Sequence, residues 1–308
     1  MTAFTVALCA AMSSCGDDEP ENDGNVIASA EVSDFGGVRL MSVDGGIDYS
    51  YNSDGTLHQV KGFGLNMTFD YKKGLMIADE EGENLEVRFT TSSKGYITGF
   101  SSSGTVKEGY VTYNYNVSHK FEYDSSDHIT YASVNQVNTD ADSHKLEEIS
   151  MSWKFSWNGD LLSKVEITGQ SNGIEGDDQM NYTNHYSYDE SVENRFMQYT
   201  YGVVESTDLP GIVQTVMYAG LFGKGMSKYP TRVYGFHERN IDYMINSRGL
   251  VETENIKYEF DDFTYPIDYT YSSSTKTNPR NAGSALRRMK AQRGDSRYHV
   301  NLFRITKI

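Results

Sequence analysis

The sequence predicts an all-β protein, a large curved antiparallel meander of β-hairpins that can close into a barrel, with one short buried helix near residues 209–223. The composition is the first indication. It contains 23 Tyr and 14 Phe in 308 residues, and these residue types favour pleated strands, while 28 Gly suit tight hairpin turns. The second indication is a strand–turn–strand unit that recurs along the chain.

Residues 49–60 show this unit most clearly. Tyr49 and Tyr51 share one face of an extended segment, residues 52–55 favour a turn, and Leu57 begins the returning strand. A first strand is expected at residues 38–43. Further strands or units of the same kind are expected at residues 67–77, 85–97, 110–117, 121–129, 186–189, 243–251 and 258–267.

The strongest strand pattern lies at residues 149–157, where every odd position is apolar and every even position is Ser or Lys. One face should therefore be buried, including Trp153 and Trp157, and the other should face water. Asn158-Gly159 then predicts a tight hairpin turn.

The predicted helix at residues 209–223 interrupts the series of hairpins. Asp208 would be its N-cap, Pro210 would lie in its first turn and Gly223 would end it. Its apolar positions predict burial, and it is too short to span a membrane.

The N-terminal residues suggest export. Residues 4–12 form a short apolar run, as expected for residues 1–14 acting as a signal peptide. The small residues before Cys15 resemble the lipobox of bacterial lipoproteins, and this resemblance implies that Cys15 is the lipid attachment site. The only other cysteine is Cys9, so the body has no disulfide framework.

Residues 15–30 are predicted to be a lipidated acidic tether, because the stretch 16–24 holds five acids and no apolar side chain. An acidic run after the lipidated cysteine resembles the surface-export signal of Bacteroidota lipoproteins. The alternative is a spacer on the periplasmic side. The localisation expected is thus an outer-membrane lipoprotein, at the cell surface or on the periplasmic face.

The charge is unevenly distributed. The net charge of −16 disfavours nucleic acid as a partner. Residues 275–308 carry nine Lys or Arg and one acid, giving +8, so that the remaining residues carry −24. This basic C-terminal segment follows the β domain at residues 31–274. It is expected to dock on the acidic body or to be solvated, with a helix at residues 284–293 and a last strand at residues 298–305.

Catalytic and metal-binding patterns are scarce. The seven histidines, expected at surface or turn positions, show no metal-ligand spacing, and no Gly-x-Ser-x-Gly is present. Residues 138–144 and 175–178 are acidic enough to suggest calcium loops, but the first lacks the Gly and Glu of an EF-hand. We therefore expect no cofactor, no metal and no catalytic residue; ligand-binding residues are not identifiable.

The hairpin units resemble the tyrosine–aspartate repeats of Rhs-type β proteins. The lipobox, the hairpins and the block at residues 217–224, followed by Tyr229-Pro230-Thr231, together resemble a Bacteroidota lipoprotein family of unknown function. The resemblance covers most of residues 35–272 and implies a porin-like antiparallel β fold.

These observations predict a non-enzymatic, lipid-anchored envelope protein that binds a ligand or partner, either a glycan or an envelope protein. A glycan-acting hydrolase with unidentified carboxylates is the alternative, as is a structural envelope protein. A transmembrane barrel is the least favoured reading, because the apolar faces of the strands are expected to fill a core.

Overall fold

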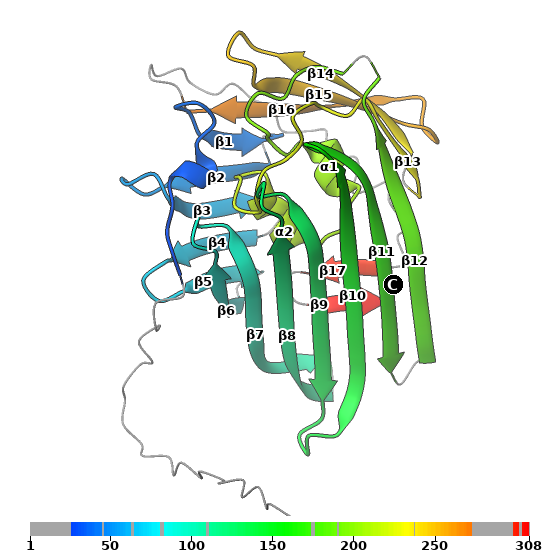
Figure 1. The fold of residues 1–308 in the computed structure, drawn as a ribbon. Helices are drawn as coiled ribbons and strands as arrows, with labels where there is room; N and C mark the ends of the chain where they lie inside the picture. The colour runs from blue at the N-terminus through cyan, green and yellow to red at the C-terminus, as the bar shows by residue number, and fades with distance from the viewer. Residues whose placement is uncertain are drawn as a thin grey trace, which may run out of the picture.

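The structure is a computed structural model that describes residues 26–44, 46–62, 65–80, 83–108, 111–173, 176–189, 191–236, 238–272, 298–301 and 304–307. Sixteen antiparallel strands form a closed barrel (Figure 1), which confirms the predicted all-β, barrel-like fold. Consecutive strands pair, and β1 closes the ring by pairing with β16. The barrel strands are β1 (Leu40–Val43), β2 (Ile47–Tyr51), β3 (Leu57–Gly62), β4 (Leu65–Asp70), β5 (Leu75–Glu80), β6 (Glu83–Thr91), β7 (Ile97–Glu108), β8 (Val111–Tyr123), β9 (Ile129–Thr139), β10 (Lys145–Asn158), β11 (Leu161–Gly173), β12 (Gly176–Ser187), β13 (Arg232–Gly235), β14 (Arg239–Ile245), β15 (Val251–Tyr258) and β16 (Thr264–Tyr271).

The alternation of side chains places apolar groups inside the barrel. On β10, Trp153 is 1% exposed, in agreement with the prediction, and Trp157 is half-buried against the core. The outward positions on the long strands are polar and exposed, for example Ser101, Asn116, Ser118, Lys120, Asn135 and Lys154. The polar face of the strands is therefore the outer face, and the apolar face fills the interior.

The recurring sequence unit corresponds to a five-residue turn. Its first and fifth residues are paired through the main chain, at Asn52 and Thr56, Ser92 and Tyr96, Asp124 and His128, Asp140 and His144, and Asn246 and Leu250. The fourth residue has a positive φ, which explains the recurring Gly and Asp; these residues are Gly55, Gly95, Asp127, Ser143 and Gly249. The residues that favour turns in the sequence thus form the tight turns of these hairpins.

Helices are few in the described part of the chain. They comprise one 3-10 turn, η1 (Glu31–Ser33), and two short α-helices, α1 (Tyr201–Glu205) and α2 (Gly211–Met217). The helix predicted at residues 209–223 corresponds to α2, which is shorter than predicted at both ends. Asp208 has a φ of 50° and precedes the helix, so that Pro210 is the N-cap and the predicted Asp208 cap is wrong. No pattern in the sequence predicted α1.

Residues 191–231, here called the plug, connect β12 to β13 and fold into the barrel (Figure 1). The plug meets the wall on several sides. Phe222 packs on Phe121 of β8 with ring centroids 4.6 Å apart, and Tyr49 of β2 donates a 2.8 Å hydrogen bond to the carbonyl of Thr215. Because the inner side chains and the plug fill this region together, they form one continuous hydrophobic core.

The C-terminal segment contributes two further strands, β17 (Tyr298–Asn301) and β18 (Arg304–Lys307), which pair with each other in a separate two-stranded sheet. The expected helix at residues 284–293, the signal peptide and Cys15 lie outside the described residues. Among the described residues, no helix is long and apolar enough to cross a membrane.

Candidate functional site

A network of buried charged and polar groups joins the plug to the barrel wall. Glu205 of α1 forms an ion pair with Arg239 of β14, and the Tyr258 hydroxyl donates a 2.7 Å hydrogen bond to the same carboxylate oxygen. The Arg239 guanidinium also lies 5.1 Å from the centre of the Tyr258 ring. Since Glu205 and Arg239 are 5% and 2% exposed, this pair holds the plug in place and is not open to a ligand.

A second buried carboxylate, Glu254 of β15, is fully enclosed. It accepts hydrogen bonds from the main-chain N–H of Gly202, at 2.9 Å, and from the Tyr269 hydroxyl, at 2.7 Å. Burial raises the pKa of Glu254, although these hydrogen bonds act in the opposite direction. A carboxylate surrounded by donors from the plug and the wall is a structural group, because no solvent reaches it.

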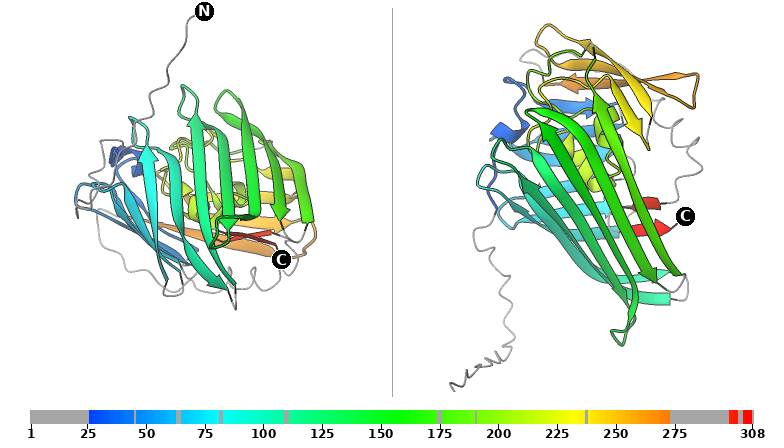
Figure 2. Two further views of the ribbon diagram at one scale, coloured as in Figure 1. Left: turned by 90° about the horizontal axis from the view of Figure 1, so that it is seen from below. Right: turned by 45° about the vertical axis from the view of Figure 1, so that its right-hand side comes forward.

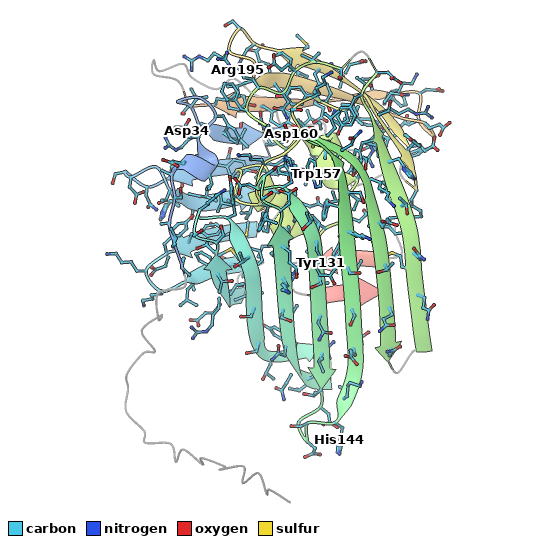
Figure 3. The ribbon with its side chains drawn as sticks, in the orientation of Figure 1. Asp34, Tyr131, His144, Trp157, Asp160 and Arg195 are labelled. Carbon is cyan, nitrogen blue, oxygen red and sulfur yellow. The ribbon has the colours of Figure 1, made fainter. Side chains whose placement is uncertain are left out.

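The candidate calcium loop at residues 138–144 is a hairpin turn at the tip of β9 and β10 (Figure 3). Asp140, Asp142 and His144 can bring ligand atoms within 4.8 Å of one another. However, the Asp140 carboxylate already accepts the N–H groups of Asp142, at 2.9 Å, and His144, at 2.8 Å. The acidic residues thus have a role in the turn itself. In the second candidate loop, at residues 175–178, residue 175 is not described.

Two histidine side chains are buried. His119 lies on β8 and is 7% exposed, so the prediction of a surface or turn position is wrong for it. His128, although 1% exposed, is the last residue of the Asp124–His128 turn, as that prediction allows. The His128 ring stacks on Trp157 with centroids 4.2 Å apart. Burial lowers the pKa of His119 to about 4, which keeps its ring neutral at ordinary pH.

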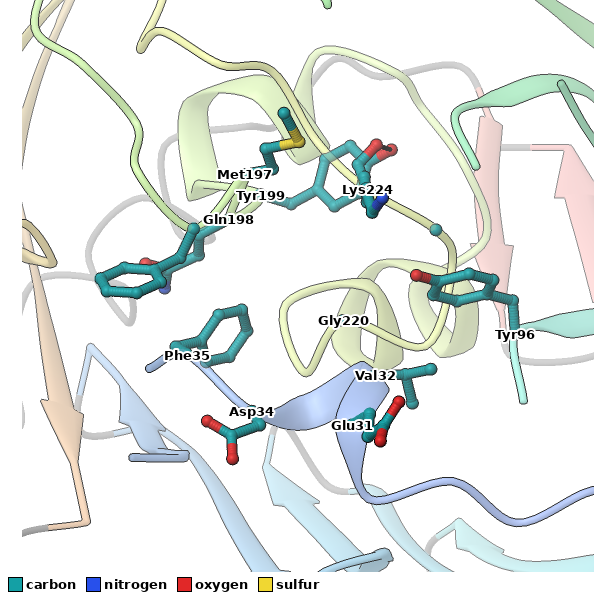
Figure 4. Close-up of a pocket in the computed structure, with 12 residues that line it drawn as sticks. Glu31, Val32, Asp34, Phe35, Tyr96, Met197, Gln198, Tyr199, Gly220 and Lys224 are labelled. Carbon is teal, nitrogen blue, oxygen red and sulfur yellow. Dashed lines mark hydrogen bonds between the residues drawn. The ribbon is translucent and has the colours of Figure 1, made fainter. Parts of the chain in front are cut away.

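A cleft of about 140 Å³ lies between η1, the plug and the start of β7 (Figure 4). Its inner lining is mostly buried and aromatic, with Phe35, Tyr96 and Tyr199 at 5%, 9% and 2% exposed. Its rim is charged, because Glu31, Asp34 and Lys224 are exposed. The rings offer apolar contacts and the rim offers charged groups, so the cleft can hold a small polar ligand.

Two glycines allow the segments around the cleft to approach closely. Gly220 has a φ of +85°, and a Cβ built there would lie 2.1 Å from the carbonyl oxygen of Val32 on η1. A Cβ on Gly36 would lie 2.5 Å from the Phe196 ring. The shape of the cleft therefore depends on close contact between the N-terminal segment and the plug, which the sequence pattern does not reveal.

The side-chain amide of Gln198 lies in the lining of the cleft. It is 1% exposed, and its Oε1 accepts a 2.9 Å hydrogen bond from the Tyr271 hydroxyl. Its Nε2 is buried and has no hydrogen-bond partner among the described residues. Since a buried amide donor is almost always satisfied, Gln198 is a candidate ligand-binding residue, and no pattern in the sequence pointed to it.

An ion cluster adjoins the cleft beside Lys224. Asp127 lies 2.6 Å from the Lys94 ammonium and 3.4 Å from that of Lys224. Burial acts to raise the pKa of Asp127, but the two lysines outweigh it and lower the pKa. Lys224 is thus held at the rim while its side chain stays accessible.

Two solved structures, both of porin-like proteins, are similar in fold to this chain. One, from Bacteroides vulgatus ATCC 8482, has a TM-score of 0.49 and 12% identity, over 75% of this chain and 97% of that chain. The other, from Bacteroides uniformis ATCC 8492, has a TM-score of 0.48 and 14% identity, over 73% of this chain and 90% of that chain. No protein-family model matches the sequence, and no curated protein matches it.

Proposed function

We propose that this chain is a lipid-anchored cell-envelope protein that binds a hydroxyl-rich ligand, such as one residue of a glycan, and does not turn it over. The observation that carries the proposal is the cleft, in which buried aromatic rings adjoin exposed charged groups and the Gln198 side chain, whose Nε2 has no partner among the described residues. Rings can stack on a sugar face while carboxylate, ammonium and amide groups bind its hydroxyls.

The anchor in this proposal is the acylated Cys15, with the acidic tether leading to the barrel. The polar outer surface supports this arrangement, because a membrane-spanning barrel needs an outward apolar band. Cys15→Ala should release the protein from the membrane fraction. Retention of the variant in washed membranes would contradict the anchor. Protease treatment of intact cells would then distinguish the surface from the periplasmic face.

Ligand binding is tested with residues 26–308 on a glycan array, followed by calorimetry with the glycans that bind. Gln198→Leu should weaken binding roughly tenfold, because the ligand would lose the hydrogen bond that it accepts from Gln198 Nε2. Tyr271→Phe is the matched control, since it breaks the internal Gln198 hydrogen bond but keeps the donor. An array on which nothing binds would refute the glycan ligand and leave a protein partner or a structural role.

The alternative is a hydrolase acting on glycans. The cleft carries two carboxylates, Glu31 and Asp34, and a glycosidase needs such a pair. Both are exposed, however, and a general acid normally requires an apolar surrounding that raises its pKa. Release of reducing ends from a bound polysaccharide, abolished by Glu31→Gln, would establish the hydrolase in place of the binding protein.

A further inference from the structure

Three phenylalanines are exposed on two turns at one end of the barrel. Phe236 lies in the turn between β13 and β14, and Phe260 and Phe263 lie in the turn between β15 and β16; they are 62%, 84% and 68% exposed. The second turn projects from the barrel in the right-hand view of Figure 2. Since phenylalanine is normally buried, a group of exposed rings indicates an interaction surface. The described residues of the two turns, here called the rim, are Phe236, Glu238 and residues 259–263.

The two turns adjoin each other. Arg239, the first residue of β14, pairs with Tyr258, the last residue of β15. Directly beyond this pair, the main-chain N–H of Glu259 donates a 3.2 Å hydrogen bond to the carbonyl of Glu238. The exposed rings therefore belong to one continuous surface at this end of the barrel.

Two of the exposed rings rest on buried or half-buried tyrosines. Phe236 stacks on Tyr182 of β12 with ring centroids 4.1 Å apart, and Phe260 stacks on Tyr258 with centroids 5.4 Å apart. The hydroxyls of both tyrosines donate hydrogen bonds to carboxylates of the plug, at 2.5 and 2.7 Å. Because the rings are already held in place, a partner that binds them would cost little side-chain entropy.

The rim is also acidic. It carries Glu238, Glu259, Asp261 and Asp262, and it has no Lys or Arg. The carboxyl groups of Glu238 and Glu259 share a hydrogen bond, which raises the pKa of Glu259 and lowers that of Glu238. Among the described residues, only Arg232 forms an ion pair with either group, at 3.5 Å from Glu238. The potential at the rings is therefore negative, and it attracts cations.

The charge of the rim decides between the occupants that the rings could accept. A second copy of the chain that docked with the same surface would bring the same carboxylates, and an anionic membrane would be repelled as well. A Lys or Arg side chain can instead place its charge beside the carboxylates and its stem or guanidinium on the rings.

We propose that the rim is a docking surface for a partner protein that presents a basic segment, with a Lys or Arg side chain beside Glu238 and Glu259 and against the exposed phenylalanine rings. The rings define where the partner binds, and the carboxylates select a cationic one. This inference does not depend on the ligand of the cleft.

The test uses the full chain and two fluorescent peptides, oligo-arginine and its uncharged counterpart oligo-citrulline, which has nearly the same shape. Fluorescence anisotropy at low salt measures the two dissociation constants. Oligo-arginine should bind at least about tenfold more tightly, because only its side chains carry the charge that the carboxylates attract. Failure of oligo-arginine to bind, or equal binding of the two peptides, would overturn the proposal.

Charge variants show whether the peptide binds at the rim. Glu238→Gln with Glu259→Gln should weaken the binding of oligo-arginine about tenfold. Asp48→Asn with Glu252→Gln is the matched control, since it removes the same charge from exposed positions on β2 and β15 away from the rim, and it should change binding less than about twofold. Equal losses in the two double variants would show attraction to the whole acidic barrel and would overturn the rim as the site.

A ring variant tests the aromatic part of the surface. Phe260→Ser should weaken the binding of oligo-arginine about threefold, because a cation–π contact is lost. Met244→Ser is the matched control, since Met244 is 57% exposed toward the other end of β14, and it should leave binding unchanged. Unchanged binding in Phe260→Ser would overturn the role of the rings. Self-association of the full chain that Phe260→Ser abolishes would identify a second copy as the occupant and would overturn the basic partner.

Discussion

The hydroxyl of Tyr123, the last residue of β8, donates a 2.5 Å hydrogen bond to the main-chain carbonyl of Ile97, the first residue of β7. The pairing of β8 with β9 shifts register at Tyr123, which is the position of a β-bulge. Other aromatic residues at strand ends make the same type of bond to the preceding strand, namely Tyr51 to Leu40, Trp157 to Ile129 and Tyr188 to Leu162. In these four places an aromatic residue at a strand end thus holds its strand to the preceding one.

Tyr123→Phe should lower the free energy of unfolding by about 1–3 kcal/mol, because it leaves a largely buried carbonyl without its side-chain donor. Chemical denaturation measures the change. Tyr131→Phe on β9 is the control, since no hydrogen bond joins the hydroxyl of this half-buried residue to another described residue, and it should change stability by less than about 0.5 kcal/mol. Equal losses in the two variants would show that the hydrogen bond at Ile97 contributes nothing.

Arg239→Met should destabilise the protein by about 3–5 kcal/mol, since it leaves the Glu205 carboxylate buried without its cation. Adding Glu205→Gln should recover part of the loss, and a double-mutant cycle in denaturant measures that coupling. Lys120→Met breaks the exposed Lys120–Glu122 pair, with its 2.6 Å contact, and should lower stability far less than Arg239→Met does, because solvent screens this pair. Additive losses at Arg239 and Glu205 would exclude coupling across the plug–wall contact.

Gly202→Ala should destabilise the protein even though alanine favours helices. A Cβ on Gly202 in α1 would lie 2.7 Å from Glu254 Oε1 and 2.8 Å from the Ile241 side chain. The same change at Gly211 in α2 meets no atom within 4 Å and should be neutral or stabilising by up to about 1 kcal/mol. Thermal unfolding of the two variants compares them directly, and a higher melting temperature for Gly202→Ala would contradict the close packing of α1 on the wall.

His119 should make stability depend on pH. Its pKa is about 4 in the folded chain and 6.5 when unfolded, so between these values the unfolded chain binds more protons. Its contribution is complete above pH 6.5 and is lost as the pH falls toward 4, by on the order of 3 kcal/mol in total. His119→Phe should remove this slope. The free energy of unfolding of both proteins is measured by urea denaturation as a function of pH. If it changed with pH equally in the original protein and in His119→Phe, the titrating group would be a residue other than His119.

The sequence by itself determined the local elements. Asn52 to Gly55 and Asn158-Gly159 define turns through residues that tolerate positive φ, and the alternation at residues 149–157 fixes which side chains share a face. These properties depend on near neighbours in the chain, so they can be read without knowing the fold.

The tertiary structure alone decided the rest. Closure of the barrel pairs Leu40 with Tyr271, and the fold of the plug brings Glu205 to Arg239. Residues of η1 and Gln198 of the plug line the same cleft. Each of these contacts depends on the summed curvature of sixteen strands and on what fills their interior. For the same reason the sequence predicted an interior but could not show that it is filled by the plug, or that His119 and Gln136 lie buried within it.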